Sequence, residues 1–120
     1  MNQEAPFDLV QRTRSFALRI IKLYAALPKT TEAQVIGKQL LRSGTSVGAH
    51  YREGRRSRST AEFISKAEGG LQELEETMYR LELLIDSGIV KGERLKDICR
   101  EADELASILV ASAKTAKKRK

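Results

Sequence analysis

Cysteine, proline and aromatic residues are scarce in this sequence. Its 120 residues include one cysteine, two prolines, no tryptophan and only 5% aromatic residues. A single cysteine excludes an intrachain disulfide framework and a cysteine-based zinc cluster. Few prolines and aromatics, together with 32% charged residues, are typical of long amphipathic helices rather than of a β-sandwich or barrel.

The sequence also lacks a long hydrophobic run. No apolar stretch approaches the ~20 residues of a membrane-spanning helix. The opening residues, MNQEAPFDLVQ, lack the apolar region of a signal peptide. We therefore expect a cytoplasmic protein with no membrane partner. The length suits a single domain over residues 1–120, with a helical core over about residues 7–113 and a basic tail over residues 114–120.

Charge is abundant but unevenly placed. The net charge is +6, yet residues 61–113 carry twice as many acidic as basic groups. The excess positive charge lies in residues 1–60 and in the tail. Two basic regions would attract polyanions such as nucleic acid. The same asymmetry would let the basic half of one subunit meet the acidic half of another.

Apolar residues at steps of three and four predict four helices. Asp8, Thr31 and Ser59 are expected to cap three of them at the N-terminus, and Gly54 and Gly88 to end two of them. The tail has no evident apolar face, so we expect it to fray. Because the connections are short, the fold class is all-α, an antiparallel up-down-up-down four-helix bundle. The expected helices cover about residues 8–26, 31–54, 59–87 and 92–113.

The same spacing predicts the core. Gly37, Gly44 and Gly48 lie inside the second helix, where close approach of a neighbouring helix or a kink would account for them. The apolar faces of the four helices are expected to be, in order, Leu9, Phe16 or Ala17, Ile20, Tyr24 and Leu27; Val35, Ile36, Leu40, Val47 and Tyr51; Phe63, Ala67, Leu71 or Gly70, Leu74, Met78, Leu81 and Ile85; and Leu95, Ile98, Ala102, Leu105 and Leu109.

Arginines gather where the second helix gives way to the third. We call Arg52, Arg55, Arg56 and Arg58 the arginine turn. Guanidinium groups hold phosphate through two parallel hydrogen bonds and stack on bases. The cations predicted to extend this nucleic-acid surface are Lys38 and Arg42 on the second helix, with Arg12, Arg14, Arg19 and Lys22 on the first. A solvated loop with ordinary surface charge is the alternative.

No pattern in the chain predicts catalysis. Ser46, His50 and Glu53 share a helical face in the order of a nucleophile, a base and an orienting acid. A regular helix, however, offers neither the strained turn nor the oxyanion site that such a nucleophile uses. With one histidine, no His-pair metal site forms within a subunit. We expect no enzyme activity, no cofactor and no metal, and we interpret Cys99 as a core or boundary residue.

Two segments resemble a known bacterial family. Leu41-Arg42-Ser43-Gly44-Thr45-Ser46-Val47-Gly48-Ala49 and Tyr51-Arg52-Glu53-Gly54 are similar to the pattern of four-helix-bundle proteins encoded by intervening sequences of 23S rRNA genes. Ser59 to Phe63, Glu75, Tyr79 and Leu81-Glu82-Leu83-Leu84 extend the resemblance, which covers about residues 7–113. The family includes accessory variability proteins of diversity-generating retroelements. That branch implies a homopentamer that binds nucleic acid and a reverse transcriptase, with the arginine turn as part of the nucleic-acid surface.

Two functions remain open from the sequence. The first is a non-enzymatic homo-oligomer that binds nucleic acid through phosphates and serves as an accessory factor to an rRNA insertion or a reverse transcriptase. The alternative is a protein–protein interaction scaffold with no nucleic-acid role, in which the basic second helix and acidic third helix serve assembly.

Overall fold

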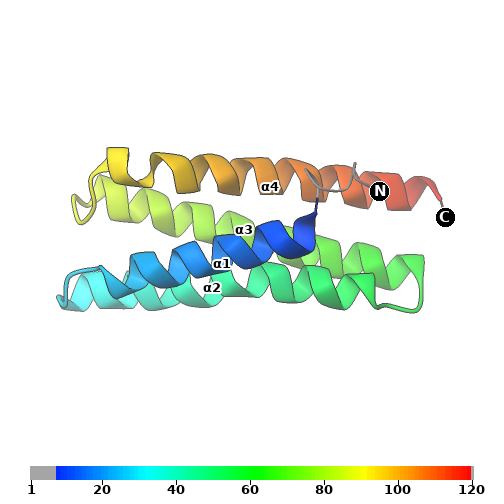
Figure 1. The fold of residues 1–120 in the computed structure, drawn as a ribbon, viewed down its shortest axis with the longest axis horizontal. Helices are drawn as coiled ribbons and strands as arrows, with labels where there is room; N and C mark the ends of the chain where they lie inside the picture. Colours follow the sequence, from blue (N-terminus) through cyan, green and yellow to red (C-terminus); the bar gives the residue numbers. More distant parts are fainter. Residues whose placement is uncertain (1–7, 120) are drawn as a thin grey trace.

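The computed structural model describes residues 8–119 and contains four helices joined by short turns. The described residues form no strand. Successive helices run antiparallel (Figure 1), which confirms the predicted all-α up-down-up-down bundle. The helices are α1 (Leu9–Ala25), α2 (Thr31–Arg55), α3 (Thr60–Asp86) and α4 (Gly92–Lys118).

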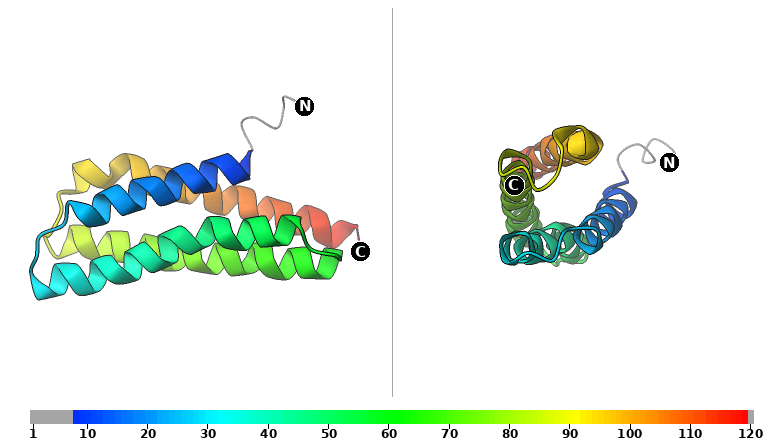
Figure 2. Two further views of the ribbon diagram at one scale, coloured as in Figure 1. Left: turned by 60° about the horizontal axis from the view of Figure 1, so that its bottom comes forward. Right: turned by 90° about the vertical axis from the view of Figure 1, so that its left-hand side faces the viewer.

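The four helices do not contact each other equally. α2 packs along α1 and α3, and α3 also packs along α4, whereas α1 and α4 touch only sparsely. The end-on view in Figure 2 shows α1 and α4 on the more open side. An ion pair links them there: Arg12 Nη2 lies 2.7 Å from Glu101 Oε1 and 3.0 Å from Glu104 Oε1. Arg12 Nε donates a further bond of 3.1 Å to Glu101, so a guanidinium fork spans the gap.

Glycines allow α2 to approach α1 closely, which settles the two explanations left open for them. A Cβ atom added to Gly44 would lie 2.8 Å from Ile20 Cγ1, and one added to Gly48 would lie 2.9 Å from Thr13 Oγ1. At Gly37 the corresponding distance to Leu27 Cδ1 is 2.7 Å. The space that a side chain would need is therefore already filled by α1 and, at Gly37, also by Leu27 just after it.

The buried core follows the prediction in α1 and α4 and departs from it in the middle helices. Val35 is 52% exposed, so its place in the predicted core is wrong. In α3 the most buried positions include Ile64, Thr77 and Leu84, one residue beside the predicted Phe63, Met78 and Ile85. The reason is that α3 faces two neighbours, α2 and α4, and its buried face is wider than a single stripe.

A polar pair lies within this core. The hydroxyls of Ser43 on α2 and Thr77 on α3 lie 2.8 Å apart, and both residues are buried. Thr77 also lies 2.9 Å from the backbone oxygen of Glu73, to which its hydroxyl can donate. Both hydroxyls therefore have partners, as buried polar groups require.

Helix ends are predicted well where a side chain caps them. Asp8 and Ser59 cap α1 and α3 as expected. Gly88 has a φ of +81° and follows α3, which confirms its role in ending that helix. The second cap is Thr30 rather than Thr31, because the Thr30 hydroxyl accepts the hydrogen bond of the Ala33 N–H at 3.3 Å.

One predicted cap and one predicted end are wrong: α2 ends at Arg55, within one residue of the predicted end, but Gly54 is not its cap. Gly54 lies inside α2 and is buried, and a Cβ added there would lie 3.0 Å from Lys66 Cβ on α3. It therefore serves close packing instead of capping. The basic tail does not fray where the structure describes it, since α4 continues to Lys118. Ala113 and Ala116, each 7% exposed, give this last part of the helix the small apolar face that the sequence analysis overlooked.

We expect Gly44→Ala to lower the free energy of unfolding by about 1–3 kcal/mol, because the new methyl group would overlap the stiff, β-branched Ile20. Urea unfolding followed by circular dichroism measures this. Gly92→Ala is the matched control, since its Cβ would meet Ile85 Cγ2 at an ordinary 3.5 Å. A Gly44→Ala protein as stable as the wild type would contradict the close-packing account.

Candidate nucleic-acid interface

Both basic regions of the sequence lie at the same end of the bundle. In an antiparallel bundle the second and fourth helices finish at one end, and Figure 1 shows the α2–α3 turn and the end of α4 there. We call this the basic end. Eight cationic residues of the described chain belong to it: Arg52, Arg55, Arg56, Arg58, Lys114, Lys117, Lys118 and Arg119.

Local hydrogen bonds fix the backbone of the arginine turn. The Ser57 hydroxyl lies 2.7 Å from the Gly54 carbonyl oxygen and donates to it. Ser59 Oγ accepts from the Glu62 N–H at 3.1 Å, and Glu62 Oε1 accepts from the Arg58 N–H at 3.0 Å. The Ser59 hydroxyl therefore caps α3, and the Glu62 carboxylate places a negative charge beside that helix end, which disfavours an anion there. Anions would be held at this turn by guanidinium groups rather than by the helix end.

The guanidinium groups of the arginine turn are available. Arg52, Arg55, Arg56 and Arg58 are all exposed, and none of them forms an ion pair with a carboxylate of residues 8–119. The nearest acidic residue in sequence, Glu53, is bound by Lys66, with 2.8 Å between Oε1 and Nζ. The hydrogen bond from Lys66, followed by its charge, lowers the pKa of Glu53.

Lys38 and Arg42 lie along α2 at a distance from the arginine turn. Fourteen residues separate Lys38 from Arg52, which corresponds to ~21 Å along a helix. Both side chains are exposed. Arg42 also faces α3, with Nη2 3.6 Å from Glu76 Oε1 and Nη1 3.9 Å from Glu73 Oε1. The structure thus places these two predicted residues outside the basic end.

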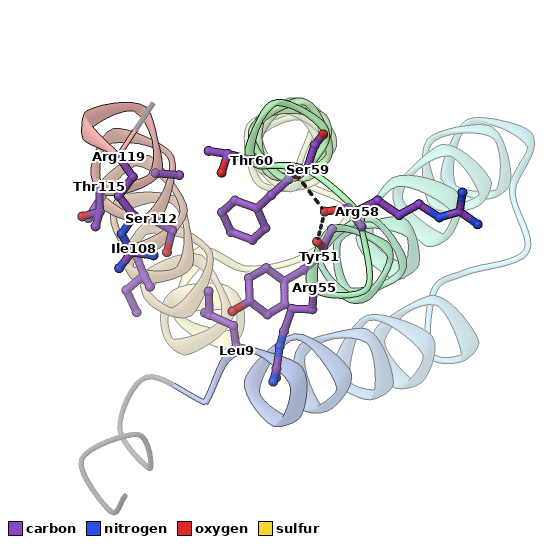
Figure 3. A pocket seen from close by; sticks show the side chains of 15 residues that line it. Leu9, Tyr51, Arg55, Arg58, Ser59, Thr60, Ile108, Ser112, Thr115 and Arg119 are labelled. Carbon is purple, nitrogen blue, oxygen red and sulfur yellow. Dashed lines mark hydrogen bonds between the residues drawn. The ribbon is translucent and has the colours of Figure 1, made fainter.

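A pocket of about 740 Å³ opens at the basic end. It exists because α1 begins at Leu9, while α2, α3 and α4 continue further (Figure 1). Figure 3 shows the Tyr51 ring pointing into the space between the helices, and the Arg58 side chain pointing away from it. Burial raises the pKa of Tyr51, the charge of Arg55 opposes that rise, and Asp8 adds to it.

The pocket lining is cationic, aromatic and rich in hydroxyl groups. No carboxylate belongs to it among the described residues. Tyr51 and Phe63, from different helices, meet edge to face with ring centroids 6.4 Å apart. The lining includes Leu9, Tyr51, Arg55, Phe63, Thr115 and Arg119.

Ser46, His50 and Glu53 are engaged with other groups. The Ser46 hydroxyl donates to the Arg42 carbonyl at 2.7 Å. His50 Nε2 lies 3.7 Å from Glu73 Oε2, and the ring rests against Gly69 of α3. Glu53 pairs with Lys66. These partners are incompatible with a serine–histidine–acid relay, and the absence of enzyme activity stays a prediction.

Other chemistry is sparse in the part of the chain that the structure describes. No three histidine, cysteine or acidic residues there come together as metal ligands. None of the described helices is long and apolar enough to cross a membrane. Cys99 is partly buried, and this burial, with the nearby charge of Glu82, raises the pKa of its thiol.

The contribution of α4 to the candidate site is absent from the prediction made on the sequence. The tail was expected to fray, so its cations were given no fixed position. In the structure they extend a helix, and Lys117 Nζ lies 2.8 Å from Glu68 Oε2 of α3. The signal was present in the helix order, because every second helix of an up-down bundle ends on the same side.

Comparisons with known proteins agree with the fold. The family model of the 23S rRNA-intervening sequence protein matches residues 6–111. A crystal structure of a protein of unknown function from the S23 ribosomal protein family of Bacteroides thetaiotaomicron has a TM-score of 0.83 and 38% sequence identity to this chain. The match covers 88% of this chain and 98% of that chain. No protein in the curated set matches.

We expect the Glu53 carboxylate to titrate at a lower pH than a free glutamate side chain, because Lys66 stabilises its charged form. Since the pKa is lowered in the folded state, the ion pair stabilises the fold above the ordinary glutamate pKa and is lost as the pH falls through the lowered value. Carbon-detected NMR titration measures the midpoint, and Lys66→Met should return it upward. An unchanged midpoint in that variant would contradict the assignment.

Proposed function

The chain belongs to the family of 23S rRNA-intervening sequence proteins, and on this premise we propose that it is a non-enzymatic, homo-oligomeric protein that binds nucleic acid. Binding uses phosphate contacts from the arginine turn and from the cations at the end of α4. Lys38 and Arg42 contribute outlying contacts along α2. The protein acts as an accessory factor, to an rRNA insertion or to a reverse transcriptase.

One observation carries the proposal: two separate basic segments share one end of the bundle. Like charges repel, so the gathering of these cations at one end destabilises the free protein, and a bound polyanion would offset that repulsion. The arginine turn keeps its guanidinium groups exposed, while Lys66 takes up the adjacent carboxylate of Glu53. Phosphate groups would supply the missing partners in the two-pronged geometry that guanidinium prefers.

Phosphate contacts of this kind imply salt-sensitive binding with little sequence preference. Each phosphate neutralised by a cation releases counterions, so affinity falls steeply with salt concentration. An oligomer would present several copies of the basic end to one nucleic acid. Contacts that are weak in one subunit would then add through multivalency.

We expect the paired substitution Arg55→Gln and Arg56→Gln to weaken binding of a labelled RNA or DNA by about tenfold at low salt. Each lost phosphate contact should also reduce the slope of log affinity against log salt by about 1. Fluorescence anisotropy over a salt series measures both quantities. The reason is that these exposed side chains carry no intramolecular partner among the described residues.

Arg94→Gln with Lys96→Gln is the matched control, because it removes two exposed charges near the start of α4, at the opposite end of the bundle. It should leave affinity almost unchanged. Equal losses in the two double variants would mean that overall charge, and not the basic end, determines binding. Wild-type binding that ignores salt would remove the proposal.

Assembly is supported by exposed apolar side chains on α1. Leu18 and Ile21 are 48% and 45% exposed, and their spacing of three places them on one face of the helix. Large apolar side chains grouped on a surface commonly mark an interface. Val110 on α4, 40% exposed, is another candidate. The pentamer is the subunit number that the family resemblance implies.

We expect Leu18→Gln with Ile21→Gln to lower the solution mass by weakening assembly, as measured by multi-angle light scattering across a concentration series. Val35→Gln is the control, because it removes an exposed apolar side chain from α2. A wild-type monomer at all concentrations would contradict the oligomer. If assembly persists and no nucleic acid binds at low salt, the interaction scaffold becomes the better description.

A further inference from the structure

The pocket at the basic end differs from the surrounding charged surface, because it combines aromatic rings with cations. Tyr51 from α2 and Phe63 from α3 form its wall, and Leu9 of α1 and Ile108 of α4 complete the apolar part. Its volume of about 740 Å³ lies in the range of small-ligand sites. A smooth phosphate-binding surface would need none of these apolar groups.

Cations border this aromatic wall from two helices. Arg55 follows Tyr51 by one helical turn and lies near enough to influence its pKa. Arg119 approaches from α4. Arg58 also borders the pocket, but its side chain turns outward (Figure 3). A flat aromatic ligand that carries a negative group would therefore meet a ring on one side and guanidinium groups at the rim.

Hydroxyl groups supply the remaining polar lining. Thr60 at the start of α3, and Ser112 and Thr115 on α4, all border the pocket. Hydroxyls both donate and accept hydrogen bonds, so they suit the mixed donor and acceptor edge of a nucleobase. No described carboxylate lines the pocket, although Asp8, next to Leu9, lies near enough to Tyr51 to raise its pKa.

We infer that this pocket holds an unpaired nucleobase against Tyr51 and Phe63, with the adjoining phosphate on Arg55 and Arg119. The inference rests on the proposed nucleic-acid function and adds a substrate class to it: single-stranded or looped nucleic acid, in which a base is free to leave its stack. Stacking on aromatic side chains, together with guanidinium contacts to the backbone, is the usual means of holding such bases. A fully paired duplex would use the basic surface alone.

The test uses a short single strand that carries one 2-aminopurine, whose fluorescence falls on stacking, and a fully paired duplex of the same length. The full-length protein should bind the single strand about tenfold more tightly than the duplex and quench the 2-aminopurine. Tyr51→Leu and Phe63→Leu should bring the single-strand affinity down to the duplex value and abolish the quenching. Duplex binding should stay within about twofold, because the phosphate contacts remain.

Tyr79→Leu is the matched control. Tyr79 is an exposed tyrosine with the Arg80 guanidinium 5.7 Å from its ring centroid, but it lies in the last third of α3 and does not line the pocket. It should change neither binding nor quenching. If the ring substitutions unfold the protein, Ala111→Met with Thr115→Met fills the pocket from two exposed positions with side chains that do not stack, and should have the same effect.

The outcomes separate this inference from the proposed function. Equal affinity for single strand and duplex, with salt-sensitive binding through the arginine turn intact, overturns the pocket and leaves the function. Absence of binding to either at low salt overturns both. A further arm adds adenosine 5′-monophosphate as competitor. If the nucleotide releases the quenched strand from the wild type at millimolar concentration, the pocket binds a base together with its phosphate, and a free nucleotide can also supply that ligand. If the nucleotide does not compete at that concentration and quenching is also absent, the result counts against base binding.

Discussion

Short connections are the constraint on which this structure depends. Each turn between helices is too short to cross the bundle, so every helix returns alongside its predecessor. As a result, α2 and α4 finish at the same end and bring residues more than fifty positions apart in sequence to one surface. A single long crossover would have sent one basic segment to the far end. The candidate site is thus a product of topology as much as of composition.

Packing within the bundle explains why the site is open on one side. Three glycines hold α2 tightly on α1, and the hydroxyls of Ser43 and Thr77 join α2 to α3 inside the core. α1 and α4 have no comparable seam and are joined by the Arg12 fork. In addition, α2, α3 and α4 extend further toward the basic end than the start of α1 does (Figure 1). The end of the bundle is therefore built by three helices around a space lined with side chains.

Much of this architecture follows from local sequence. Asp8 and Ser59 mark the starts of two helices, because their side-chain oxygens accept hydrogen bonds from the free backbone N–H groups of the first turn. Leu95 to Leu109 show a buried face because α4 turns one face to the core. Val35 was misplaced because it neighbours Ile36, and spacing alone does not say which of two adjacent apolar residues faces inward. Glycine is a residue type common at helix ends, so the sequence suggests that Gly54 is a cap. Only the close approach of α3 shows that Gly54 serves helix packing and not capping.

The candidate site was only partly predictable for a related reason. The arginine turn is evident because its four cations are close in the chain. Lys117 and Arg119 come close to the arginine turn only through the tertiary arrangement. This arrangement needs a helical tail, which the buried Ala113 and Ala116 stabilise. Lys38 and Arg42 carry the same charge as the residues of the arginine turn, so the sequence alone does not separate them from it. Their distance from the turn appears only once α2 is a continuous helix.

The crowding of positive charge also has a consequence for how this protein behaves in a test tube. A folded form that gathers cations binds multivalent anions better than an unfolded chain that disperses them, so sulfate or phosphate in a buffer acts as a thermodynamic ligand. Melting temperatures will therefore depend on the choice of anion at constant ionic strength. A protein purified in phosphate buffer would therefore show a higher melting temperature than the same protein in chloride.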